Sequence, residues 1–135
     1  MDAAKRRKLV EVLAEQPEPP LIPIEPFFDG NDDQKSIGSN LMEHPGIETF
    51  RQILTGLLKR PDVLAVYVQI AELDPGEEAW PVTDTIFVVG PIPAEELQAV
   101  LEPLQPDKVG VGREFGIPPA IHQKHHAPVL AAWWE

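Results

Sequence analysis

The sequence contains no cysteine, which excludes disulfide bonds, thiolate metal ligands and a cysteine nucleophile. It also lacks an apolar run near the ~20 residues that span a bilayer, and its first residues lack the ~7 to 15 residue apolar stretch of a secretory signal. Serine occurs only at Ser36 and Ser39, so a serine hydrolase would have to use one of them beside His44. We therefore expect a soluble, cytoplasmic protein that does not contact a membrane.

Positive charge is scarce as well, because 11 Lys and Arg residues against 22 Asp and Glu residues give a net charge of -11. Four of the positive residues form the cluster Lys5-Arg6-Arg7-Lys8 near the N-terminus, which is typical of a solvated helix end. The rest of the surface should be strongly acidic and should repel phosphate backbones. This charge disfavours nucleic-acid binding and favours a basic protein partner.

Proline, by contrast, is in excess, with 16 of 135 residues against a usual share of ~5%. Each proline fixes φ and removes a backbone donor, so regular elements should be short. The hydrophobic share of 43% is ordinary for a globular protein, and the length suits one core. Prolines between residues 17 and 26 follow an N-terminal helix. We predict a helix and Pro-rich linker over residues 1–20 and a single α+β domain over residues 21–135.

Hydrophobic periodicity predicts the order of the helices and strands. Apolar residues recur at helical spacing in three segments, and β-branched runs between turn residues indicate strands. The predicted helices are 3–16, 47–59 and a third from Pro93, and the predicted strands are 21–25 at an edge, 63–71, 85–89, 108–111 and 129–134. From residue 21 the order is β-α-β-β-α-β with an extra C-terminal strand. This order is typical of a ferredoxin-like split βαβ sheet with two helices on one face.

Residues 27–46 lack a sustained period and are rich in turn formers, which predicts a long loop. From Asp29 onward the loop resembles a calcium-binding loop, but its sixth position is Gln34 instead of Gly and its twelfth is Asn40 instead of Glu. These polar side chains either cap the backbone of the loop or contact a partner or ligand. The candidate contact residues of the loop are Asp29, Asn31, Asp32, Asp33, Ser36, Asn40 and His44.

Three clustered histidines raise the question of a metal site. His122 would share a helix face with His125 or His126, but prolines at 118, 119 and 128 flank the segment and predict a loop. No further ligand has convincing spacing. We predict neither a metal ion nor a cofactor.

Tryptophan supplies the largest aromatic anchors, at Trp80, Trp133 and Trp134. Adjacent residues of a strand point to opposite faces, so one of the two C-terminal rings should enter the core while the other lies on the second sheet face. We therefore add Trp80 and Trp134 to the candidate contact residues. The strand 129–134 is apolar throughout, so we expect a homodimer to cover it, with the N-terminal helix of the same chain as the competing cover.

Four loop segments and the C-terminus carry a resemblance to known sequences. They are Gly30-Asn31-Asp32-Asp33, Ser36-Ile37-Gly38, Asn40-Leu41, His44-Pro45-Gly46 and the terminal Trp133-Trp134-Glu135. Together they resemble a group of short uncharacterised bacterial proteins, over most of the chain after Ile24 and without the N-terminal helix. The resemblance implies a bacterial cytosolic protein and carries no activity, substrate or catalytic residue.

Three functions fit the sequence. The leading hypothesis is a non-enzymatic binding or accessory module, with the sheet face and the 29–44 loop as its contact surface. The second is an acidic inhibitor or immunity-type protein that masks a basic toxin or nuclease. The third is a small-ligand or metal-dependent enzyme that uses Asp29, Asp32, Asp33 and His44. The known phosphate-loop, nucleophile-elbow and zinc-helix motifs do not occur, which favours the first.

Overall fold

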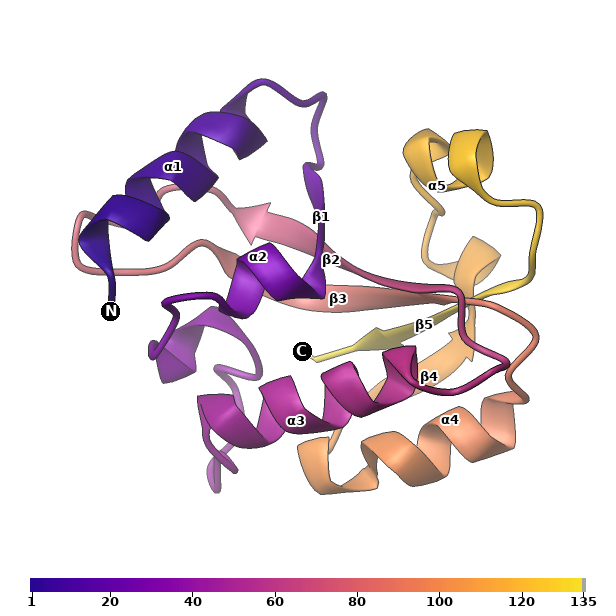
Figure 1. The fold of residues 1–135 in the computed structure, drawn as a ribbon. Helices are drawn as coiled ribbons and strands as arrows, with labels where there is room; N and C mark the ends of the chain where they lie inside the picture. Colours follow the sequence, from indigo (N-terminus) through magenta and orange to yellow (C-terminus); the bar gives the residue numbers. More distant parts are fainter. Residues whose placement is uncertain (135) are drawn as a thin grey trace.

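The computed structural model describes residues 1–134 and shows an α+β protein built on one antiparallel sheet (Figure 1). The sheet has five strands in the order β1-β2-β3-β5-β4, and every neighbouring pair is antiparallel. The strands are β1 (Leu21–Pro23), β2 (Ala65–Glu72), β3 (Val82–Val89), β4 (Lys108–Val111) and β5 (Val129–Trp133). All five lie where the sequence predicts strands, and β1 is an edge strand as expected.

Five α-helices surround this sheet, of which the sequence predicts three. They are α1 (Ala3–Ala14), α2 (Ile24–Phe28), α3 (Ile47–Leu58), α4 (Ala94–Leu101) and α5 (Pro119–Lys124). The structure confirms α1, α3 and α4. The other two correct the sequence prediction: α2 replaces the end of the predicted strand 21–25 and the start of the predicted loop 27–46, and α5 forms in the segment around His122 that was predicted as a loop. Both helices are too short to show a hydrophobic period. Pro119 stands at the start of α5, where proline fits because the missing donor has no helical partner.

The strand order does not confirm the ferredoxin-like arrangement. In a split βαβ unit, the two strands joined by the helix are parallel and another strand lies between them. Here β1 and β2 are direct antiparallel neighbours, which such a unit does not allow. The strands β3 and β4, which α4 joins, do meet the definition, since they are parallel and β5 lies between them. The prolines around β1 explain its position, because a strand poor in N–H donors cannot pair on both sides.

The sheet packs on both faces. One face contacts α1, α3 and α4 in a large cluster that includes Leu13, Leu54 and Leu97. On the other face Ile121 of α5 packs with Phe87 and with neighbouring strand residues. Figure 1 shows α3 and α4 together on one side of the sheet and α5 on the opposite side. The connection from β4 to β5 therefore covers much of the second face.

This cover changes the setting of β5. The strand is internal, and residues 129–132 are all buried by the chain itself. We expected a second copy or the N-terminal helix to cover it, whereas residues of the 112–127 segment do so. Homodimer formation stays a prediction. The reason given for it, an uncovered apolar strand at residues 129–134, does not hold because the chain itself covers β5.

The N-terminal helix shares the core of the sheet. Leu9 and Leu13 belong to the same cluster as the strands, and Asp2 caps the helix by accepting hydrogen bonds from the N–H groups of Ala4 and Lys5. The solvated-end interpretation of the positive cluster was wrong for Arg6, which is buried. Its guanidinium donates to the carbonyls of the β2–β3 turn and pairs with Asp74 at 2.5 Å. The boundary predicted at residue 20 stays a prediction.

Within residues 1–134, the structure contains no helix of the length and apolarity needed to cross a membrane.

Candidate functional site

The polar side chains of the 29–44 loop are engaged mostly within the loop. Asn31 is buried, donates to Ser36 Oγ at 2.9 Å and accepts from the N–H of Asp33 at 2.9 Å. Asp33 then accepts from the N–H of Lys35 and, across the chain, from the N–H of Trp80 at 3.0 Å. The backbone-capping interpretation therefore describes these residues in the structure.

The other acidic residues of the loop contact the N-terminal segment. Asp29 Oδ1 accepts from Lys5 Nζ at 2.6 Å, and Asp32 Oδ2 pairs with the amino group of Met1 at 2.9 Å. Both carboxylates are more than half exposed, so these pairs contribute little stability by themselves. The two ion pairs lie where the N-terminal segment contacts the loop, with Lys5 beside Asp29.

The two remaining loop candidates lie further along. Asn40 donates to Asp107 Oδ2 at 3.2 Å. His44 accepts from the N–H of Gly46 at Nδ1, at 2.9 Å, so its ring proton sits on Nε2, which donates to the carbonyl of Ile37 at 2.8 Å. Both ring nitrogens are therefore used inside the loop, and His44 has no free nitrogen for a metal or a substrate.

The tryptophan candidates are core residues in the structure. Trp80 is 0% exposed and Trp134 is 1% exposed. Trp134 Nε1 donates to the carbonyl of Leu104 at 2.8 Å, and its ring lies 5.8 Å from that of Phe50. The adjacent Trp133 is half-buried on the other face, as strand alternation predicts. Of the C-terminal pair, Trp133 is the ring that reaches the surface.

The histidines near the C-terminus do not converge on one point. His125 Nε2 is 2.8 Å from the hydroxyl of Tyr67, whereas His122 and His126 are exposed. Among residues 1–134, no group of three or more His, Asp or Glu side chains lies close enough together to hold a metal ion.

We predict that metal ions do not stabilise the fold. Thermal unfolding in EDTA, and then in excess Ca²⁺ or Zn²⁺, should give midpoints within about two degrees of each other, because a ligand raises the midpoint only by binding the native state. A rise of several degrees in either metal would contradict this prediction.

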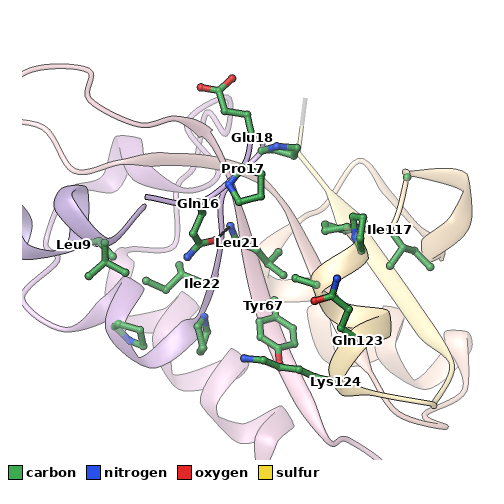
Figure 2. Close-up of a pocket in the computed structure, with 18 of the residues that line it drawn as sticks. Leu9, Gln16, Pro17, Glu18, Leu21, Ile22, Tyr67, Ile117, Gln123 and Lys124 are labelled. Carbon is green, nitrogen blue, oxygen red and sulfur yellow. Dashed lines mark hydrogen bonds between the residues drawn. The ribbon is translucent and has the colours of Figure 1, made fainter. Parts of the chain in front are cut away.

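A groove of about 1190 Å³ lies elsewhere, between α1 and α5. Figure 2 shows Leu9 and Gln16 on one side of the groove, Ile117 and Gln123 on the other, and Leu21 between them. Most of the lining is apolar. Prolines form much of both walls, at Pro17, Pro19, Pro23, Pro26, Pro118 and Pro119. We call this feature the α1–α5 groove.

The floor of the α1–α5 groove carries two polar groups. Tyr67 lines it, burial raises the pKa of its phenol, and the hydroxyl lies 2.8 Å from His125 Nε2. The N–H of Leu21 points to the side of β1 away from β2 and donates to Gln16 Oε1 at 3.0 Å. The side chain of Gln16 thus accepts the hydrogen bond that a further strand would accept at the β1 edge of the sheet.

The rim of the groove differs in charge from the rest of the protein. Three lysines line it, Lys5, Lys8 and Lys124, against the two acids Glu18 and Asp29. Lys5 pairs with Asp29, and its pKa is raised by that hydrogen bond and by the charge of the carboxylate. Within residues 1–134, neither Lys8 nor Lys124 forms an ion pair. The groove is therefore slightly positive on a chain of net charge -11.

Sequence reasoning missed the α1–α5 groove, although parts of the signal were visible. The positive cluster at residues 5–8 and the prolines at 17–26 stand out in the sequence. Their meeting with residues 116–124, about a hundred positions later, depends on the fold alone.

The fold and the groove define an α+β protein with an open antiparallel sheet and an apolar groove across one sheet edge. The chain belongs to the Uncharacterized protein YfbO family, whose model matches residues 4–130. The match includes α1, which the resemblance found in the sequence left out, and it ends before Trp133 and Trp134. Glu135, the last residue of that resemblance, lies outside the described residues. No curated protein and no solved structure matches the chain.

Proposed function

We propose that the chain is a non-enzymatic binding module whose binding surface is the α1–α5 groove. The observation that carries this proposal is the groove itself, about 1190 Å³ in volume, mainly apolar and walled by prolines. Ligand sites are typically apolar concavities with a few polar groups, and Tyr67, Gln16 and Gln123 supply such groups here. Proline walls lose little conformational entropy on binding, which favours affinity.

The groove replaces the 29–44 loop and the sheet face as the proposed contact surface. The polar groups of that loop are used in contacts within the chain, and the second sheet face packs against α5. The same contacts weaken the case for an enzyme that uses the loop. A bacterial cytosol as its location is supported by the absence of cysteine and by the loop resemblance.

Binding of a neutral, environment-sensitive dye tests this proposal. Nile red should bind the native protein with one site per chain, and Val12→Glu should weaken binding about tenfold, which corresponds to about 1.4 kcal/mol. Val12 is 45% exposed and lines the groove, so a charge there should leave the fold intact.

The matched control is Leu58→Glu, on an α3 residue that is 41% exposed and lies outside the groove. It should leave dye affinity unchanged, and the thermal midpoints of both variants should stay near that of the parent. Equal loss of dye binding in the two variants, or no binding by the parent, would contradict the proposed function.

A further inference from the structure

The size of the α1–α5 groove matches a short helix. One wall is lined by Lys5, Lys8, Leu9 and Val12 of α1 and by Gln16, which follows the helix. At 1.5 Å per residue, this wall is about 16 Å long. A helix of this length spans about three turns. The groove volume of about 1190 Å³ is larger than the roughly 300–1,000 Å³ of typical small-molecule pockets.

The groove walls disfavour an extended peptide. Added strands bind through backbone hydrogen bonds to a sheet edge, but Pro23 has no N–H and the N–H of Leu21 is already taken by Gln16. A helix satisfies its own backbone and needs only an apolar surface from its host. Covering an exposed sheet edge with a helix is also a common way for proteins to protect that edge.

The charge of the rim selects the sign of the occupant. Lys8 lies on α1 and Lys124 lies on α5, so the two lysines that have no ion pair within the described residues stand on opposite walls. A helix seated between them would place its two flanks beside positive charge. The chain has a net charge of -11, so the rest of its surface would repel an acidic partner. An acidic partner therefore fits this groove better than the remaining surface.

From these observations we infer that the α1–α5 groove binds an amphipathic helix of an acidic protein partner, with its apolar stripe on the proline walls and acidic side chains beside Lys8 and Lys124. The inference rests on the proposed binding function. The net charge of the chain suggests a basic partner, whereas this inference assigns an acidic partner to the groove.

Binding of designed peptides tests the inference. The probe is a labelled 16-residue helical peptide with leucines at positions i, i+3, i+4 and i+7 and glutamates on both flanks. One comparison peptide carries lysines in place of the glutamates, and another carries a central proline that breaks the helix. In fluorescence anisotropy at low salt, the acidic helix should bind at least tenfold more tightly than either comparison peptide. The preference over the lysine peptide should shrink at high salt.

Charge reversal in the protein supplies the second arm. The double variant Lys8→Glu with Lys124→Glu should lose about tenfold or more in affinity for the acidic peptide. The control, Lys35→Glu with Lys59→Glu, makes the same change in net charge at exposed positions outside the groove. It should change peptide affinity less than twofold at physiological salt.

The outcomes separate the two proposals. Suppose that Nile red binds the parent and that Val12→Glu weakens this binding, but that the lysine peptide or the proline peptide has the same affinity as the acidic helix. The inference is then wrong and the binding function stands. Equal losses in the two double variants would show only a general charge effect and would also overturn the inference. If the parent protein does not bind Nile red, the proposed function itself fails.

Discussion

Replacing Gly90 by alanine is expected to destabilise the protein by more than about 4 kcal/mol, a large part of the roughly 5–15 kcal/mol that stabilises a domain. Gly90 directly follows β3 and has a φ of +140°, which residues with a side chain rarely adopt. A Cβ atom there would lie 2.3 Å from the carbonyl oxygen of Asp62 and 3.0 Å from Val63 Cα. Both contacts are with backbone, so no side chain can move aside.

Gly90 is also held in place by its own hydrogen bond, since its N–H donates to the carbonyl of Pro128 at 2.9 Å. Relief of the clash would therefore separate the turn after α3 from the start of β5. We expect the variant either to be insoluble or to melt without a cooperative transition in circular dichroism.

Gly56→Ala is the matched control for this substitution. Gly56 is exposed in α3, and a Cβ atom there would meet no atom within 4 Å. Because alanine loses less backbone entropy than glycine in a helix, this variant should gain about 0.5–1 kcal/mol. A Gly90→Ala protein that melts within two degrees of the parent would show that the turn accommodates a side chain.

The second large effect is expected at Arg6, where replacement by alanine should cost about 2–3 kcal/mol. The guanidinium donates to the carbonyl of Ala79 at 2.6 Å and to that of Gly76, and it pairs with Asp74. The arginine side chain is 10% exposed in this position. Alanine would leave the turn between β2 and β3 without these donors, so the midpoint should fall by roughly 5–12 °C.

Arg7→Ala is the control, because the next residue of α1 is exposed and its removal should change stability by less than about 0.5 kcal/mol. Arg6→Lys should recover only part of the loss, since an ammonium group lacks the planar fork that reaches two carbonyls and a carboxylate together. Equal midpoints for the Arg6 and Arg7 variants would show that the contact with the turn does not contribute to stability.

Much of the secondary structure follows from the sequence because its signals are local. The stripe of Phe50, Leu54 and Leu57 predicts α3, and the β-branched run of β2 predicts a strand. The prolines at residues 17–26 correctly predict that β1 stays at an edge. Helices as short as α2 and α5 escape this reasoning, since five or six residues cannot show a helical period.

The candidate site was harder to predict from the sequence, because the sequence does not show whether a polar residue has a hydrogen-bond partner. Asp33 accepts a hydrogen bond from the N–H of Trp80, and Asn40 donates one to Asp107, both across long stretches of chain. Such partners can be found only once the chain has folded. The 29–44 loop therefore appeared more available for binding than its contacts allow.

The α+β class, the positions of the strands and the acidity of the chain can be predicted from the residues alone, because these properties depend on composition and on neighbours within a few residues. The strand order and the α1–α5 groove become visible only in the folded protein. The groove joins residues 5–29, Tyr67 and residues 116–124, and these segments meet only through the packing of the whole core. Non-local contacts of this kind are set by the free energy of the complete fold, which no local pattern expresses.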